Sequence, residues 1–92
     1  MYLNKPRVSI VIPTYNEREN ISKIIEMLRK SLKGIEHEIV FVDDNSPDGT
    51  SFEIKNFIKN SSDIHLIHRI GRRGLSGAII EGIFAANSEL VA

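Results

Sequence analysis

Two short apolar runs that each end abruptly in polar residues constrain the fold of this chain more than any other feature. One run, Val40-Phe41-Val42, stops at the adjacent carboxylates of Asp43 and Asp44. The other covers residues 8–12 and ends in Pro-Thr-Tyr-Asn-Glu. Runs rich in β-branched residues are typical of strands buried on both faces, as in parallel sheets. Because such sheets bind ligands at the carboxyl ends of their strands, both polar segments are candidates for a site.

Helical and strand patterns alternate along the chain. Apolar residues at helical spacing predict helices at residues 17–32, 51–60 and 75–86. The predicted strands lie before, between and after these helices, at residues 8–12, 38–42, 64–67 and 89–92. This β-α-β-α-β-α-β order predicts an α/β fold with a Rossmann-like parallel sheet, right-handed crossovers and helices that cover the sheet.

Local signals predict the helix ends and the core. Capping boxes that pair Asn16 with Glu19 and Thr50 with Glu53 would start the first two helices. Gly34 would end the first helix. We expect the four phenylalanines to lie in the core rather than to form a stacking platform: Phe41, Phe52, Phe57 and Phe84.

Length and charge limit the classes of function. The 92 residues suggest a single domain or part of one, so residues 1–92 are treated as one unit. The 12 Lys and Arg balance the 12 Asp and Glu, which gives no general attraction to nucleic acids or anionic membranes. The absence of cysteine excludes disulfides and thiolate metal sites and fits a reducing compartment, so we expect a soluble, cytoplasmic chain. The histidines lack a second ligand at metal spacing and are expected to be structural: His37, His65 and His68.

The last residues suggest that the chain is a fragment of a longer domain. Residues 89–92 open an apolar run with no turn or cap after it. An uncovered sheet edge would result, and such an edge favours self-association.

The segment that ends the first run supplies one half of the candidate site. Tyr15 offers a ring that can stack on a nucleobase, and Glu17 offers oxygens that accept hydrogen bonds from it. The same segment also suits an ordinary turn, in which Pro13 fixes φ and Asn16 caps a helix. Local chemistry leaves the two interpretations equally open.

The two carboxylates supply the other half. Adjacent carboxylates repel each other, so one of them favours a hydrogen-bond donor or a cation nearby. We expect Asp44 to contact a ligand, either a base, a ribose or a metal. Asp48 and Thr50 are expected to serve the turn and the helix start that follow.

An arginine- and glycine-rich stretch follows the third predicted strand. Its members are Arg69, Arg72 and Arg73, with Gly71, Gly74 and Gly77. Arginines can neutralise a diphosphate, and glycines let backbone N–H groups approach it. A solvated loop explains the same composition. The stretch is not a Walker loop, since no Gly-Lys-Ser/Thr follows.

Three segments together resemble one family. They are Val-Ile-Pro-Thr-Tyr-Asn-Glu-Arg-Glu-Asn-Ile at 11–21, Val-Asp-Asp-Asn-Ser-Pro-Asp-Gly-Thr at 42–50, and Arg-Gly-Leu-Ser-Gly-Ala at 73–78. They are similar to segments of dolichol-phosphate mannosyltransferases, within the GT-A group of inverting glycosyltransferases that use nucleotide-diphosphate sugars. The resemblance spans residues 7–92, and the second segment is the most specific to enzymes that act on polyprenyl phosphates.

The resemblance implies a nucleotide pocket at the ends of the first two strands. The residues that it assigns to nucleotide-sugar binding are Pro13, Tyr15, Glu17, Asp43, Asp44, Arg73 and Gly74. It implies GDP-mannose as the donor and a polyprenyl phosphate at the cytoplasmic face of a membrane as the acceptor. In the family an Asp-X-Asp motif holds a divalent metal, Mg²⁺ or Mn²⁺, and here it would follow residue 92. We therefore expect no catalytic residue, no metal ligand and no turnover from this chain alone.

Other interpretations stay open. A non-catalytic α/β binding or interaction module would show the same pattern. A dinucleotide-binding Rossmann enzyme would need glycines in the first turn, where this chain has Pro-Thr-Tyr-Asn-Glu. A phosphoacceptor receiver domain would carry acidic residues at the end of the first strand and an Asp after the third, where this chain has His68 and Arg69.

Overall fold

The protein is seen in a computed structural model, which describes residues 8–69, 77 and 90–91. Among these residues, parallel strands form one sheet in the order β3-β2-β1-β4. The strands are β1 (Val8–Thr14), β2 (His37–Asp43), β3 (Ile64–His68) and β4 (Leu90–Val91). The helices are the 3₁₀ helix η1 (Arg18–Asn20), α1 (Ile21–Ser31) and α2 (Thr50–Ile58). The predicted α/β fold with a parallel sheet is confirmed.

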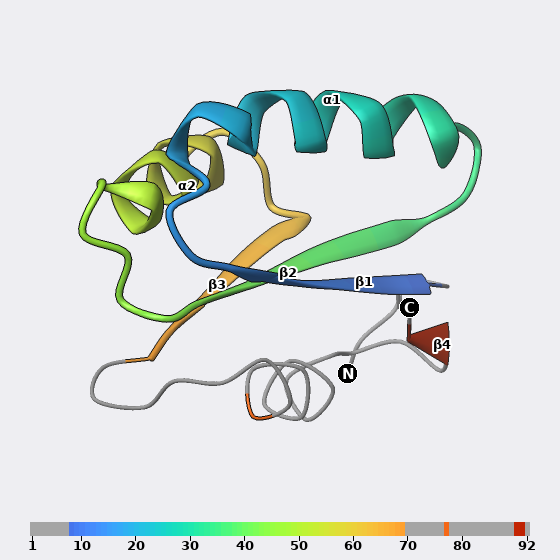
Figure 1. Ribbon diagram of the computed structural model, residues 1–92. Coiled ribbons are helices and arrows are strands. Elements are labelled where there is room, and N and C mark those ends of the chain that lie inside the picture. The colour runs from blue at the N-terminus through green and yellow to red at the C-terminus, as the bar shows by residue number, and fades with distance from the viewer. Residues whose placement is uncertain (1–7, 70–76, 78–89, 92) are drawn as a thin grey trace.

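The core lies on both faces of β2. Successive residues of a strand point to opposite faces, so Ile39 and Phe41 face the helices whereas Val40 and Val42 face the other side. Figure 1 shows α1 and α2 together over one face of the sheet. The main core cluster lies between this face and the helices: Ile21, Ile25, Ile39, Phe41, Ile54 and Ile64. The apolar run thus forms a strand buried on both faces, as predicted.

Both capping-box predictions are wrong. α1 begins at Ile21 after the 3₁₀ turn, and its N-cap residue Asn20 makes no side-chain cap. Asn16 lies outside the helix with a φ of 57°. α2 begins at Thr50, and its N-cap residue is Gly49, with a φ of 89°. Neither Asn16 nor Thr50 caps its helix, because Asn16 N donates to Ser46 and the Thr50 hydroxyl accepts from Glu17 N, contacts that join the segments after β1 and β2.

Two further expectations on the core have different outcomes. Phe41 is fully buried and Phe57 packs against the core, as expected. The expectation for Phe52 is wrong, because it lies on the outer side of α2 and is 66% exposed. Phe84 and the predicted helix at 75–86, apart from Gly77, lie outside the described residues. Within the described part of the chain, no helix is both long and apolar enough to cross a membrane.

Gly34 allows the connection between α1 and β2 to turn. Its φ is 85°, and a Cβ built on it would meet no atom within 4 Å. Gly34→Ala is therefore expected to lower the free energy of unfolding by about 1 kcal/mol through backbone strain alone. Gly34→Asn should lose less, because Asn tolerates this conformation better. Urea unfolding followed by circular dichroism checks both, and an alanine variant as stable as the parent would contradict the strain.

Candidate functional site

The carboxyl ends of three neighbouring strands meet at one edge of the sheet. Thr14, Asp43 and His68 lie in register across β1, β2 and β3. The pairing continues one residue further, since Asp44 N donates to Thr14 O at 3.1 Å and Arg69 N donates to Asp43 O at 2.8 Å. The loops after β1 and β2 lie at this same edge (Figure 1). The two polar segments singled out in the sequence are therefore neighbours in space.

Asp43 is fully buried, and its carboxylate accepts hydrogen bonds from three segments of the chain. The donors are Thr14 Oγ1 at 2.8 Å, Ser46 N at 3.0 Å, Ser46 Oγ at 2.6 Å and Ser51 Oγ at 2.7 Å. Burial raises the pKa of Asp43, but the bonds from Ser46, Ser51 and Thr14 outweigh it and hold the pKa below its ordinary value. The Asp43 carboxylate thus links β1, the β2–α2 loop and α2 through hydrogen bonds.

Asp44 has quite different surroundings. Its side chain is 12% exposed, and its Oδ1 lies 3.2 Å from Nη1 of Arg69, a residue whose side chain is 4% exposed. In the described residues this Oδ1 has no hydrogen bond of normal geometry, so the contact is an ion pair only. The carboxylate oxygens of Asp44 are acceptors, the kind of group to which the ring N–H of a nucleobase could donate.

Gly77 gives Arg69 room beside Asp44. A Cβ at residue 77 would lie 2.8 Å from Arg69 Nη2 and 3.4 Å from Cζ and Nη1. Gly77→Ala is therefore expected to displace the guanidinium and weaken its pairing with Asp44. The check is the NMR signal of the Arg69 side-chain Nε–Hε group, which should shift in the variant while the signals of the helical core stay in place. An unchanged Arg69 signal would show that the guanidinium does not depend on this space.

The loop after β1 is fastened to the loop after β2. Three successive backbone N–H groups donate to side chains across the gap: Asn16 N to Ser46 Oγ at 2.8 Å, Glu17 N to Thr50 Oγ1 at 3.0 Å, and Arg18 N to Asp48 Oδ2 at 3.2 Å. The Thr50 hydroxyl in turn donates to Asp48, and this bond is the main reason why the pKa of Asp48 lies below its ordinary value. These contacts fix the backbone around Tyr15, a residue that is 41% exposed.

Five of the seven residues predicted for nucleotide-sugar binding lie at this edge: Pro13, Tyr15, Glu17, Asp43 and Asp44. Arg73 and Gly74 lie outside the described residues. Sequence reasoning missed the bridging hydroxyls of Ser46 and Ser51, because both stand in a segment that already looks like a turn and a helix start. The pairing of Arg69 with Asp44 was also missed, although each residue lies two positions after the end of a predicted strand and directly after the observed one.

The three histidines make local contacts. His65 Nε2 lies 3.2 Å from Oε1 of the buried Glu38, and His68 Nε2 lies 3.1 Å from Asn45 Oδ1. His37 Nδ1 lies 2.9 Å from the carbonyl oxygen of Ile35. Across residues 8–69, with 77 and 90–91, no group of three or more His, Cys, Asp or Glu is placed to hold a metal ion.

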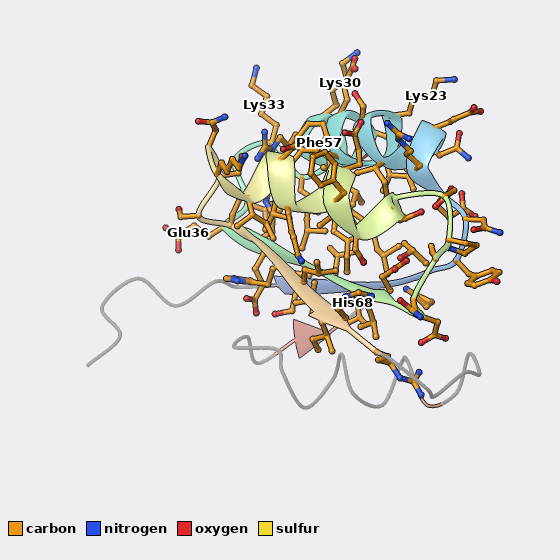
Figure 2. All side chains as sticks on the ribbon, turned by 90° about the vertical axis from the view of Figure 1, so that its left-hand side faces the viewer. Lys23, Lys30, Lys33, Glu36, Phe57 and His68 are labelled. Carbon is orange, nitrogen blue, oxygen red and sulfur yellow. The ribbon has the colours of Figure 1, made fainter. Side chains whose placement is uncertain are left out.

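The helical layer carries a hollow of its own. It has a volume of about 370 Å³, and its lining includes Arg29, Lys30, Lys33 and Phe57. Figure 2 shows Lys30 on α1 and Lys33 in the turn after it, both projecting away from the sheet, with Phe57 on α2 and His68 at the end of β3. This hollow, the helical-layer groove, is also lined by Glu26 and lies away from the loops that follow β1 and β2. It is an alternative location against which a ligand at the strand edge can be tested.

Comparison with known proteins decides the family. The family model described as "Glycosyl transferase family 2" matches residues 9–92. The chain belongs to this family. The match includes both loops of the candidate site, so the interpretations as a dinucleotide-binding Rossmann enzyme and as a receiver domain are excluded. In this glycosyl transferase family 2 chain, the paired loops are part of the family domain rather than a feature of an unrelated interaction module.

Curated relatives include polyprenyl-phosphate mannosyltransferases. The dolichol-phosphate mannosyltransferase of Pyrococcus furiosus is 39% identical over 84 residues, which cover 91% of this chain and 24% of that protein. The undecaprenyl-phosphate mannosyltransferase of Micrococcus luteus is 38% identical over 76 residues, which cover 83% of this chain and 30% of that protein. The dolichol-phosphate mannosyltransferase of Saccharomyces cerevisiae is 31% identical over 84 residues, and the chain covers 32% of it. The chain thus spans 24% to 32% of the length of these relatives.

A solved structure shares the fold. It is a mannosyltransferase from Pyrobaculum calidifontis in complex with GDP-Man and Mn²⁺, with a TM-score of 0.79 and 28% sequence identity. The alignment covers 97% of this chain and 27% of that one. The architecture of the glycosyl transferase family 2 chain is therefore that of the GT-A mannosyltransferases.

Proposed function

We propose that this chain is the nucleotide-sugar-binding part of a glycosyltransferase that transfers mannose from GDP-mannose to a polyprenyl phosphate. The observation that carries the proposal is the pair of joined loops at the strand edge, with Asp44 directly after β2 and Tyr15 exposed in the loop after β1. The curated relatives are dolichol- and undecaprenyl-phosphate mannosyltransferases, and the similar structure contains GDP-Man, which supports the donor and the acceptor class.

Each residue has its own role in this proposal. The ring of Tyr15 stacks on the base, Pro13 and Glu17 line the base and ribose, and Asp44 accepts a hydrogen bond from a ring N–H. Guanine and uracil both offer such an N–H, so the preference for guanine rests on the relatives. We place Arg73 and Gly74 near the diphosphate. The acceptor phosphate is already anionic at neutral pH, so its attack on the anomeric carbon has little need of a general base.

A divalent metal, Mg²⁺ or Mn²⁺, would neutralise the charge that develops on the leaving diphosphate. The described acidic residues do not fit as its ligands. The Asp43 carboxylate is occupied by protein donors, Asp44 pairs with Arg69, and no group of three ligands occurs in the described ranges. We therefore assign no catalytic step to these residues. The full enzyme would work at the cytoplasmic face of a membrane, where its lipid acceptor lies.

Calorimetric titration of the 92-residue chain with GDP, UDP and NAD tests the proposal. We expect GDP to bind, UDP to bind more weakly, and NAD not to bind. Tighter binding of UDP than of GDP would contradict the guanine assignment. A folded chain that binds neither GDP nor UDP would contradict the nucleotide site itself and favour a non-catalytic module.

A further inference from the structure

We propose that Ser46 is a positioning residue for nucleotide recognition, because its hydroxyl holds the loop of residues 15–17 in the conformation that receives the base. The inference rests on the proposed nucleotide site and adds a residue that touches no ligand itself. Its basis is a chain of hydrogen bonds that runs from a buried charge to the backbone between the two proposed contact residues, Tyr15 and Glu17.

The hydroxyl of Ser46 has a fixed direction. Ser46 Oγ donates its only proton to Asp43 Oδ1 at 2.6 Å, while Ser46 N donates to Asp43 Oδ2 at 3.0 Å. The proton is committed to the buried carboxylate, so the lone pairs of Oγ are left to accept, and one accepts from Asn16 N at 2.8 Å. The bond to Asp43 thus orients the Ser46 hydroxyl so that its oxygen accepts a hydrogen bond from Asn16 N.

Asn16 needs such support. Its φ of 57° lies in the left-handed region, which costs an L-residue free energy that other contacts must offset. Asn16 stands directly between Tyr15 and Glu17, so a change in its backbone would redirect both side chains. Without the Ser46 oxygen, the described contacts would leave Asn16 N with no acceptor, and the loop would lose one of its three cross-loop bonds.

Ser51 provides a matched control. Its hydroxyl donates to Asp43 Oδ2 at 2.7 Å, a bond much like that of Ser46. Ser51 lies on α2, and its hydroxyl has no described bond to residues 15–17. Ser46→Ala and Ser51→Ala therefore each remove one hydroxyl from the same carboxylate, but only Ser46→Ala cuts the connection to the loop.

The experiment compares GDP affinity and urea stability for the parent chain, Ser46→Ala, Ser51→Ala and Ser46→Thr. We expect Ser46→Ala to weaken GDP binding about tenfold, a change comparable to the net contribution of one hydrogen bond. Ser51→Ala should stay within about twofold of the parent although it loses comparable stability. Ser46→Thr retains the hydroxyl and should restore the affinity of the parent.

Several results would overturn the inference. One is equal weakening of GDP binding in Ser46→Ala and Ser51→Ala, which would show that the loss of affinity follows from the loss of stability alone. Another is failure of Ser46→Thr to restore affinity. Hydrogen exchange at the Asn16 amide of the parent chain tests the same bond even if Ser46→Ala does not fold: we expect slow exchange, and the rate of an unprotected amide would overturn the inference. A parent chain that does not bind GDP would instead contradict the proposed function, and the exchange rate would still report on the loop.

Discussion

Replacing Asp43 with alanine is expected to lower the free energy of unfolding by about 3 kcal/mol or more. The substitution leaves four donors at the centre of the site without their acceptor. An unsatisfied buried donor costs about 1–3 kcal/mol, although hydroxyl groups can turn to relieve part of this. Asp43→Asn should lose less than the alanine variant, since it retains one acceptor oxygen but places an NH₂ group against donors. Urea unfolding followed by circular dichroism measures both.

The control for this prediction is Glu19→Gln, because Glu19 is an exposed carboxylate for which the described part of the chain shows no hydrogen bond. It should stay within about 0.5 kcal/mol of the parent. A loss in Asp43→Ala no larger than in Glu19→Gln would contradict the role of Asp43 as the joint between the three segments.

The pH dependence of stability gives an independent measure of Asp43. Its pKa is lowered in the folded chain, so the unfolded chain binds the proton more readily and folding favours the charged form. The resulting stabilisation is complete above the unfolded pKa of about 4 and is lost as the pH falls through the lower folded value. Because Asp48 contributes in the same direction, the useful quantity is the difference between the parent and Asp43→Asn. This difference should shrink as the solution becomes acidic, and a difference that stays constant with pH would show that the charge of Asp43 does not stabilise the fold.

Replacing Asp44 with alanine is expected to weaken GDP binding about 10- to 100-fold. The reason is the loss of a charged acceptor, since hydrogen bonds to charged groups contribute about 1.5–3 kcal/mol. The substitution also removes the ion-pair partner of Arg69, so the stability of each variant is measured alongside its affinity. Asp44→Asn should fall between the alanine variant and the parent, because it retains one acceptor oxygen.

Two other acidic residues serve as comparisons for Asp44. Asp63 pairs with Arg29 at 3.2 Å and directly precedes β3, at the opposite edge of the sheet, so Asp63→Asn should leave GDP affinity unchanged. Asp48→Ala should weaken binding less than Asp44→Ala, since in the described part of the chain the Asp48 side chain acts on the loop through Arg18 N and Thr50. Equal losses of GDP affinity in the Asp44 and Asp63 variants would contradict the assignment of Asp44 to the nucleotide site.

The strands and the place of the site follow from the sequence because they depend on local patterns. An apolar run that stops at carboxylates gives both β2 and the position of Asp43 and Asp44 at its carboxyl end. The predicted capping boxes were wrong for a tertiary reason. Thr50 matches a capping pattern, yet its hydroxyl bonds the backbone of Glu17, which is 33 residues away along the chain.

The different roles of Asp43 and Asp44 also depend on tertiary structure. Adjacent strand residues point to opposite faces, and Asp43 shares the face of Phe41, where α2 brings Ser51 within reach. Asp44 emerges on the other side, beside Arg69. The alternation of faces can be read from the sequence. The donors that contact each carboxylate cannot, because they come from α2 and from the end of β3, whose positions depend on the tertiary fold. Sequence reasoning therefore assigned both acids to the ligand.

The most direct test of the central claim is the set of backbone amide signals that move when isotope-labelled chain is titrated with GDP. The strand-edge site predicts shifts that cluster at Tyr15, Glu17 and Asp44, with little change in α1 and the outer surface of α2. Shifts that cluster instead at Arg29, Lys30 and Phe57 would place the ligand in the helical-layer groove. That result, or a well-dispersed spectrum in which GDP moves no signal, would contradict a nucleotide site at the carboxyl ends of β1 and β2.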